Sequence, residues 1–270
     1  MPTKRSIVLD PLIPRHSDIM ELAKRDGRVD VDGLAAHFDV TPQTIRKDLN
    51  VLCDHDLLER VHGGAIYKSG VSNYAYTARR SHAAAEKAAI GKAAAQLIPD
   101  NASLILNIGT TTEQVAEALV RHDGLMVITN NINVANILHN GSNAEVVVAG
   151  GMLRKSDGGL VGEATIDFIK QFKVDFAVIG VSSIDSDGSL LDYDYREVRI
   201  AQAILQHARK RILVSDSMKF ERNAPVRIGH LADIDYFVTD RMPSEAIQTL
   251  CRDAETEIIV ALPSNSESEL

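Results

Sequence analysis

Residues 41–49, with the sequence TPQTIRKDL, constrain the fold and function of this chain more than any other stretch. Thr41 is suited to cap a helix, and Pro42 suits the first helical position, where its missing N–H is not needed. Apolar residues recur at helical spacing and predict one buried side, formed by Ile45, Leu49 and Leu52. The opposite side carries groups that can reach DNA bases and phosphates, namely Thr41, Gln43, Thr44, Arg46 and Lys47.

The flanking residues predict the rest of a winged helix-turn-helix. Apolar spacing indicates a helix over residues 15–25, Val29 and Val31 alternate like a short strand, and Asp32 can cap a second helix. The few residues before Thr41 leave room for only a tight turn, as in a helix-turn-helix. Two further strands are expected on either side of the sequence His62-Gly63-Gly64, and they form the wing.

This wing brings two more candidate DNA contacts, Arg60 and His62. A winged helix that binds protein is the alternative, but the cations beside Gln43 and Thr44 favour DNA. The chain as a whole is acidic, with a formal charge of −8, so a basic surface has to be concentrated on one face. That face would collect Lys4, Arg5, Arg15, Arg46, Lys47 and Arg60.

The length of 270 residues leaves room for a second domain. We expect a DNA-binding domain at residues 1–68, a polar linker at 69–82, an effector-binding domain at 83–262 and a disordered tail at 263–270. The two cysteines lack metal-ligand spacing, and we expect neither a metal nor a cofactor. No signal peptide or membrane-spanning stretch is evident, which indicates a cytoplasmic protein.

The second domain alternates apolar runs with helical patterns. The runs lie at residues 103–108, 125–130, 144–149, 175–181, 211–215, 235–239 and 256–262, and helical patterns separate most of them. Buried parallel strands read as continuous apolar runs, so the alternation predicts a doubly wound α/β sheet. In such sheets, ligands bind beyond the carboxyl ends of the strands.

The loop after the first of these strands has the sequence NIGTTTE, residues 107–113. A glycine allows a close turn, and main-chain N–H groups at a helix start attract an anion. We therefore expect one phosphate group at Gly109, Thr110, Thr111 and Thr112, rather than a threonine-rich helix cap without a ligand. The Walker and Rossmann glycine patterns are absent.

Residues in the other strand-to-helix loops can converge on the same place. Lys219 would neutralise the phosphate, and the carboxylates of Asp194 and Glu197 could bind the hydroxyls of a sugar or polyol. The remaining candidates in these loops are Asn130, Gly150, Gly151 and Ser182.

The chain resembles the DeoR family of bacterial repressors. It matches the family's T-x-x-T-I-R-R/K-D-L helix at residues 41–49 and its H-G-G wing at 62–64. The resemblance implies a homo-oligomer that binds inverted operator half-sites and is released by a phosphorylated small molecule. Further matches are similar to the branch concerned with glycerol metabolism, which implies glycerol 3-phosphate as the effector. They lie at residues 129–131, 133–136, 149–151, 157–159, 162–165 and 184–191.

The second domain is also similar to ribose-5-phosphate isomerase. The isomerase's phosphate loop corresponds to residues 109–112, and its D-x-S-K element to 216–219. Its acidic D-G-A-D-E stretch corresponds to residues 180–184, where Ser182 and Ser183 replace the carboxylates that enediol chemistry needs. We therefore expect a sensor, not an enzyme. The alternatives are a sugar-phosphate isomerase with a DNA-binding appendage, an interaction module with a degenerate pocket, and a repressor that senses another sugar phosphate.

Overall fold

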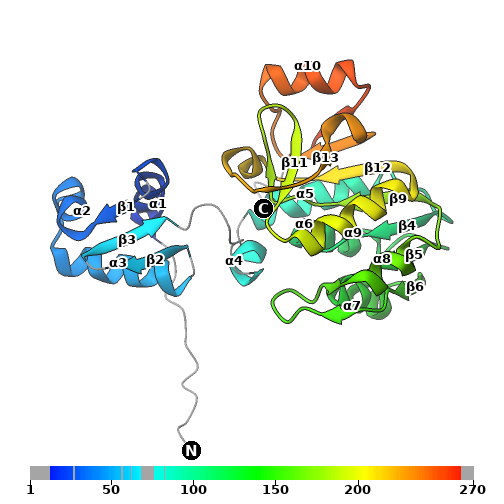
Figure 1. Ribbon diagram of the computed structural model, residues 1–270, viewed down its shortest axis with the longest axis horizontal. Helices are drawn as coiled ribbons and strands as arrows, with labels where there is room; N and C mark the ends of the chain where they lie inside the picture. Colours follow the sequence, from blue (N-terminus) through cyan, green and yellow to red (C-terminus); the bar gives the residue numbers. More distant parts are fainter. Residues whose placement is uncertain are drawn as a thin grey trace, which may run out of the picture. The chain divides into compact units, whose positions relative to one another are not determined.

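The computed structural model describes residues 13–26, 28–55, 57–61, 63–67, 76–81 and 83–262. The chain divides into two compact units, Met1–Ala78 and Arg79–Leu270 (Figure 1). Several residues of the predictions lie outside the described ranges, namely Lys4, Arg5, His62 and the expected tail at 263–270.

The N-terminal unit is a winged helix. It contains α1 (Pro14–Asp26), α2 (Val31–Phe38) and α3 (Pro42–Asp54), with the strands β1 (Arg28–Asp30), β2 (Leu58–Val61) and β3 (Gly64–Tyr67). The strands form an antiparallel sheet in the order β1–β3–β2. Its core joins side chains from all three helices with side chains from the strands, among them Ile19, Leu34, Ile45, Leu49, Leu52, Leu58 and Ala65.

Helices α2 and α3 each begin with a side chain that caps the helix. Thr41 caps α3 as expected, because its Oγ1 accepts a hydrogen bond of 3.2 Å from the main-chain nitrogen of Thr44. The prediction that Asp32 caps α2 is wrong. Asp30 caps this helix instead, accepting a 2.7 Å hydrogen bond from the nitrogen of Gly33, and Val31 is already helical.

The segment expected as a linker, residues 69–82, contains a short helix, α4 (Tyr76–Ser81). The division between the two units falls within this helix, after Ala78. Six residues are too few to give a clear periodic signal in a polar sequence. Arg79 is the first residue of the second unit.

The second unit is built on a parallel sheet of seven strands. They are β4 (Ser103–Leu106), β5 (Met126–Thr129), β6 (Glu145–Val148), β9 (Val174–Ile179), β12 (Ala208–Val214), β14 (Tyr236–Thr239) and β15 (Glu257–Val260). Their order in the sheet is β15–β14–β12–β9–β4–β5–β6. The chain winds outward first through β5 and β6 and then through β12 and β14. The sheet is thus doubly wound, with its switch point between β4 and β9.

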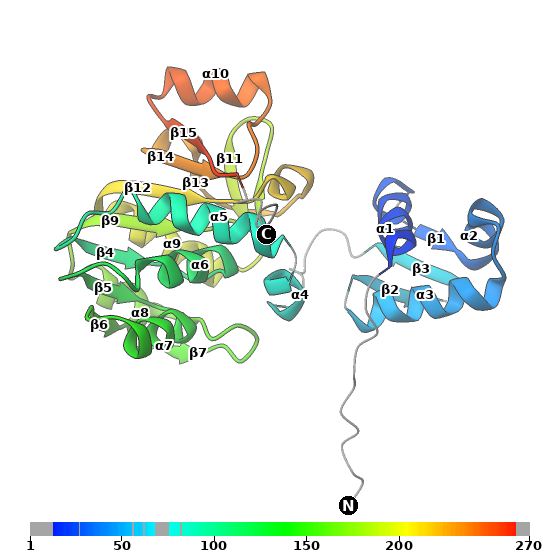
Figure 2. The same ribbon diagram turned by 180° about the vertical axis from the view of Figure 1, so that it is seen from behind.

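Helices cover both faces of this sheet (Figures 1 and 2). One face packs against α5 (Ala84–Ala95), α6 (Thr110–Leu119) and α7 (Ile132–Gly141). The other packs against α8 (Glu163–Ile169), α9 (Tyr195–Gln206) and α10 (Glu245–Asp253). Successive residues of a strand point to opposite faces, so Leu104 and Leu106 join the first cluster while Ile105 joins the second.

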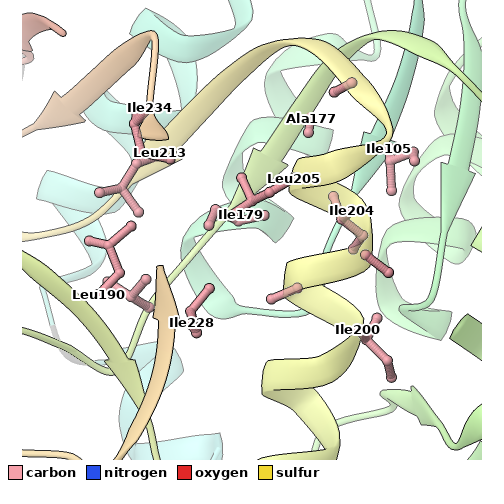
Figure 3. Close-up of a cluster of buried hydrophobic side chains, with 14 of the residues drawn as sticks. Ile105, Ala177, Ile179, Leu190, Ile200, Ile204, Leu205, Leu213, Ile228 and Ile234 are labelled. Atoms are coloured by element: carbon pink, nitrogen blue, oxygen red, sulfur yellow. The ribbon is translucent and has the colours of Figure 1, made fainter. Parts of the chain in front are cut away.

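Smaller elements complete the second unit. A second sheet has the order β10 (Ser183–Ile184), β11 (Ser189–Asp192) and β13 (Val226–His230). Its Leu190 and Ile228 join the same hydrophobic cluster as Ile204 of α9 (Figure 3). A hairpin of β7 (Met152–Leu153) and β8 (Leu160–Val161) and two 3-10 helices, η1 (Ser217–Glu221) and η2 (Leu231–Asp233), were not expected. Within the described ranges, no helix is long and apolar enough to cross a membrane.

Candidate DNA interface and effector site

The outer side of α3 carries the predicted DNA contacts. The side chains of Gln43, Arg46 and Lys47 are exposed, and Thr44 is half-buried. On the opposite side, Ile45, Leu49 and Leu52 are fully buried in the core. Helix α3 therefore presents polar and cationic groups to the exterior near its N-terminal end, as a recognition helix does.

An ion pair that the sequence did not indicate fixes the inner side of α3. Asp48 is buried, and its Oδ2 lies 2.7 Å from Nε of Arg15. Its Oδ1 lies 3.3 Å from Nε2 of His16, whose Nδ1 accepts a hydrogen bond from the nitrogen of Ile13. The proton of a neutral His16 therefore belongs on Nε2. Arg15, expected among the DNA-facing cations, is instead engaged with Asp48.

Arg60, the predicted contact on the wing, is exposed on β2. Its Nη1 donates a 3.1 Å hydrogen bond to the main-chain oxygen of Gly64 across the hairpin. This contact braces the wing and leaves other guanidinium N–H groups for a phosphate.

The second unit contains a cleft at the carboxyl ends of β4, β9 and β12. The cleft lies at the switch point of the sheet, where ligands bind in doubly wound folds. Six of the predicted effector residues line it: Gly109, Thr110, Thr111, Ser182, Glu197 and Lys219. Arg79, Ile108, Asp157, Gly180, Val181, Asp192 and Val214 complete the lining.

The loop after β4 forms one wall of the cleft. Gly109 precedes the first residue of α6 and has a φ of 145°, a backbone conformation that favours glycine. Thr110 and Thr111 follow and face the cleft. Thr112 does not line it, because its hydroxyl turns back to donate a 2.8 Å hydrogen bond to the oxygen of Gly109. The free N–H groups of the helix start and two hydroxyls thus remain for an anion.

Cations gather beside this loop. Lys219 lies on η1, which is held in place where Asp240 accepts hydrogen bonds from the nitrogen and the hydroxyl of Ser217. Burial, reinforced by the charge of Arg222, lowers the pKa of Lys219 to about 7. Burial likewise lowers the pKa of Lys87 in α5 to about 8. Both lysine pKa values are lowered because the two side chains are buried and other cations lie near them. A bound anion would favour the charged form of each lysine.

Arg79 is a cleft residue that the sequence did not indicate. It comes from α4, and its main-chain oxygen accepts a hydrogen bond from Nζ of Lys87. Its Nη2 lies 3.5 Å from Oδ2 of Asp157. The one feature of the sequence that could have pointed to it is the pair Arg79-Arg80, just before the expected second domain.

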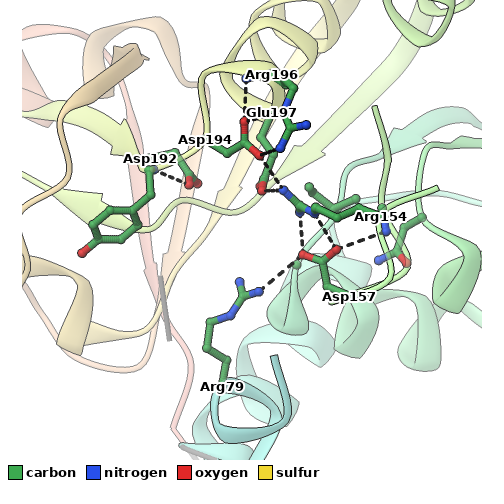
Figure 4. Close-up of polar contacts among 12 residues, drawn as sticks. Arg79, Arg154, Asp157, Asp192, Asp194, Arg196 and Glu197 are labelled. Carbon is green, nitrogen blue, oxygen red and sulfur yellow. Dashed lines mark hydrogen bonds and ion pairs between the residues drawn. The ribbon is translucent and has the colours of Figure 1, made fainter. Parts of the chain in front are cut away.

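A network of carboxylates around Arg154 forms another part of the site (Figure 4). Arg154 lies between β7 and β8, and its guanidinium contacts Asp157 at 2.9 and 2.5 Å. It also reaches α9, contacting Asp194 at 3.1 Å and Glu197. Hydrogen bonds from Arg196 and Arg154 lower the pKa of Asp194 to about 2. Asp194 thus stands outside the lining of the cleft but holds Arg154 in place.

Three other predicted effector residues also lie away from the cleft lining. Asn130 is fully buried, and its side chain donates to the main-chain oxygen of Leu160 in the β7–β8 hairpin. The main-chain oxygen of Gly150 accepts a hydrogen bond from the hydroxyl of Thr165, and an added Cβ at Gly151 would meet the same hydroxyl. Asn130 thus binds the β7–β8 hairpin, and Gly150 and Gly151 pack against Thr165 of α8. None of the three lines the cleft.

Ser182 and Asp192 face the cleft together. Ser182 follows β9 and Asp192 ends β11, and the main-chain nitrogen of Ser182 bonds to the oxygen of Leu191. The carboxylate of Asp192 is buried, which raises its pKa, and it accepts hydrogen bonds from the nitrogen of Tyr193 and the hydroxyl of Ser182. In the described part of the chain, no three His, Cys, Asp or Glu side chains are grouped as metal ligands.

Two family models match the chain. The DeoR-like helix-turn-helix domain matches residues 15–71, and the DeoR C-terminal sensor domain matches residues 82–241.

Curated relatives cover almost the whole chain. It is 45% identical over 91% of its length to the glycerol-3-phosphate regulon repressor of Haemophilus influenzae, covering 96% of that protein. It is 44% identical over 90% of its length to the protein of the same name from Escherichia coli, covering 97% of it. The transcriptional repressor CsqR of Escherichia coli is 38% identical over 92% of this chain and 95% of its own.

The chain also resembles solved structures at lower sequence identity. Ribose 5-phosphate isomerase from Plasmodium falciparum superposes with a TM-score of 0.37 at 15% identity, over 51% of this chain and 52% of that chain. Translation initiation factor eIF-2B from Pyrococcus horikoshii OT3 superposes with a TM-score of 0.42 at 14% identity, over 80% of this chain and 82% of that chain.

Proposed function

Because the chain belongs to the DeoR family of transcriptional repressors, we propose that it binds an operator and releases it when glycerol 3-phosphate fills the cleft of the sensor domain. The cleft itself carries this proposal. It offers helix-start N–H groups, threonine hydroxyls and the cation Lys219 to a phosphate. It offers the carboxylates of Asp157, Asp192 and Glu197 to hydroxyl groups.

The identity of the effector rests on a second observation. The relatives that are 44–45% identical over about nine-tenths of the chain are named repressors of the glycerol-3-phosphate regulon. Because that regulon is named for glycerol 3-phosphate, identity over this much of the chain supports glycerol 3-phosphate as the effector. A repressor that senses another sugar phosphate would share the phosphate end of the cleft and differ at its hydroxyl end.

We further propose that the protein acts in the cytoplasm as a homo-oligomer on inverted half-sites. A two-fold arrangement of winged helices requires such symmetry in the operator. The acidic overall charge supports this, because a single winged helix on an acidic chain has little non-specific attraction for DNA. Lys219, Thr110 and Thr111 are the proposed phosphate contacts, and Gln43, Thr44, Arg46 and Lys47 are the proposed DNA contacts.

The sensor domain is not an enzyme. The curated relatives are transcriptional repressors. Ser182 lines the cleft and Ser183 starts β10, at the positions where the resemblance to the isomerase would require acids. A general base and acid flanking a carbonyl are needed for isomerisation, and serine hydroxyls cannot replace them at neutral pH.

A titration of a preformed operator complex tests the proposal. Glycerol 3-phosphate should release the DNA, whereas glycerol, which lacks the anion, should not. The effect should correspond to about 1–3 kcal/mol of coupling between the two sites. If fructose 1-phosphate releases the operator and glycerol 3-phosphate does not, the repressor senses another phosphate ester. If no phosphate ester acts, the loop at Gly109 is only a helix cap.

A further inference from the structure

Helix α4 lies in the chain between the winged helix and the sensor, and it contributes Arg79 to the effector cleft. The division between the two units falls within this helix, directly before Arg79. Arg80, the next residue of α4, is exposed. All the other lining residues belong to the segment from Ile108 to Lys219. The chain that leads from the DNA-binding unit into the sensor therefore carries, where it enters the sensor, a side chain that an effector can contact.

Two contacts hold Arg79 in the sensor. Its main-chain oxygen accepts a hydrogen bond from Nζ of Lys87 in α5. Its Nη2 lies 3.5 Å from Oδ2 of Asp157, and Figure 4 shows the side chain extending from its helix toward that carboxylate. Two charged side chains of the sensor thus set the position of α4 at Arg79.

The contact between Arg79 and Asp157 is the weaker of the two ion pairs that this carboxylate makes with arginines. Charged N–H···O hydrogen bonds are typically about 2.7–2.9 Å long, so 3.5 Å is a loose contact. Arg154 binds the same carboxylate through two nitrogens, at 2.9 and 2.5 Å. Asp157 therefore keeps a cationic partner if Arg79 leaves it, and no buried carboxylate loses its neutralising charge.

The phosphate is the charged group of the proposed effector, and Arg79 shares the cleft with the proposed phosphate contacts Thr110, Thr111 and Lys219. Burial lowers the pKa of Lys219 to about 7, and the positive charge of Arg79 contributes to that shift. The two cations therefore lie within electrostatic reach of each other. A guanidinium can donate two parallel hydrogen bonds to a phosphate, which is a stronger interaction than one loose contact with a carboxylate.

We propose that Arg79 couples the effector cleft to the DNA-binding unit: the bound phosphate attracts its guanidinium away from Asp157, and the new contact shifts α4 and the chain that leads to the winged helix. The inference rests on the proposed function of the cleft as a site for a small phosphate ester. It deepens that function by naming the residue whose contacts differ between the empty and the loaded sensor. A ligand can shift an equilibrium only through such a difference.

Operator titrations of the full chain separate coupling from effector affinity. The anisotropy of a fluorescent operator fragment gives the operator dissociation constant at rising glycerol 3-phosphate and constant ionic strength. The midpoint of the effector dependence reports effector affinity. The plateau ratio, defined as the operator dissociation constant at saturating effector divided by that without effector, reports coupling. We expect a plateau ratio of about 5 to 150 for wild type.

The variant Arg79→Gln should reduce the plateau ratio to about two or less, because a neutral side chain is not attracted to the phosphate. Arg80→Gln is the matched control, since it removes the same charge from the exposed neighbour on α4 and should keep the wild-type ratio. Arg79→Lys keeps the charge without the planar fork of donors, so its ratio should lie between those of wild type and Arg79→Gln.

A residue that only adds effector affinity behaves differently. Thr111→Val should move the midpoint to higher glycerol 3-phosphate concentrations and keep the plateau ratio, because Thr111 lies on α6 within the body of the sensor. An Arg79 that only stabilised the fold would likewise leave the plateau ratio unchanged while lowering the stability of the sensor.

A wild-type plateau ratio in Arg79→Gln would overturn the coupling role and leave the sensor function standing. If Arg79→Gln does not fold, a wild-type ratio in Arg79→Lys has the same meaning. An equal loss in Arg80→Gln would also overturn it, because the charge of α4 and not the contact in the cleft would then matter. If glycerol 3-phosphate leaves operator binding by wild type unchanged, the proposed function fails, and this inference fails with it.

Discussion

The Nε atom of Arg15 lies 2.7 Å from Oδ2 of Asp48, so an ion pair ties the first helix of the winged helix to the inner side of α3. Asp48 is buried, and its partners come from α1. The stability of the DNA-binding unit should therefore depend on this carboxylate.

The variant Asp48→Ala should lower the free energy of unfolding of this unit by about 2 kcal/mol, because it removes the charged hydrogen bond from Arg15 and leaves the buried His16 without its partner. Urea denaturation followed by circular dichroism measures the change. Asp32→Ala, at an exposed position on α2, is the control and should have a much smaller effect. Equal free energies of unfolding for Asp48→Ala and Asp32→Ala would contradict a structural role for the ion pair.

Arg46 and Lys47 should make different contributions to operator binding. Arg46→Ala should lose about 1–3 kcal/mol and relax the sequence preference if it reaches a base edge. Lys47→Ala should weaken all sequences more evenly and reduce the salt dependence, because a phosphate contact releases counterions. Gel shifts at several salt concentrations distinguish the two. Unchanged operator binding by a folded double variant would remove α3 from the interface.

Lys219→Ala should produce a repressor that no longer responds to its effector. The lysine lies in the cleft and not on the winged helix, so operator affinity without effector should be unchanged. Thr111→Val should act in the same direction, because it removes a hydroxyl donor and keeps the shape of the side chain. Effector titrations of the operator complex measure the response. Lys170→Ala, at an exposed position, is the control, and a normal response from Lys219→Ala would place the phosphate elsewhere.

Effector affinity should fall as the pH rises from about 7 to about 9. In the empty cleft, burial and the charge of Arg222 lower the pKa of Lys219 to about 7. A bound phosphate favours the charged lysine and raises that pKa, so binding takes up a proton above neutrality. The ester is already a dianion there, since its second pKa is about 6. Calorimetry in buffers of different ionisation enthalpy measures the uptake.

The same experiment on Lys219→Ala should show a smaller proton uptake. Lys87, whose pKa is lowered to about 8 by burial, accounts for part of what remains. An affinity that is constant between these pH values in wild type would show that neither lysine gains a proton on binding.

The purified protein should not interconvert ribose 5-phosphate and its ketose isomer. Glu197 is a candidate base in the cleft, and Arg154 already engages it. A spectroscopic isomerase assay at high protein concentration tests this. Turnover that disappears in Glu197→Gln would show that the sensor domain catalyses the reaction.

The large sheet was predictable because its central strands, such as β4 and β9, are largely buried on both faces. Each apolar run of the sequence overlaps one strand of the sheet, since a residue such as Leu104 or Ile105 is buried whichever face it points to. The small sheet was not predictable. Its strand β10 has two residues, and β11 pairs with β13 through an irregular register between Leu190 and Leu191. Tertiary contacts, not local periodicity, define such strands.

The residues of the candidate site likewise fall into those that the sequence predicted and those that it did not. Gly109, Ser182 and Lys219 lie in the segments that follow β4, β9 and β12, and the carboxyl ends of parallel strands converge, so their proximity follows from the topology. Arg79 and Asp192 come from a short helix and from a strand without a periodic signal. Their place in the cleft depends on how these elements pack, which no local pattern encodes.

Helix α3 separates the side that we propose to read DNA from the side that anchors the helix in the core. Gln43, Arg46 and Lys47 are exposed, while Ile45, Asp48, Leu49 and Leu52 are buried, and no residue belongs to both groups. Mutations at the reading positions can therefore change the target sequence without disturbing the fold. A duplicated copy of such a gene can acquire a new operator in single steps, each of which leaves a folded protein for selection to act on.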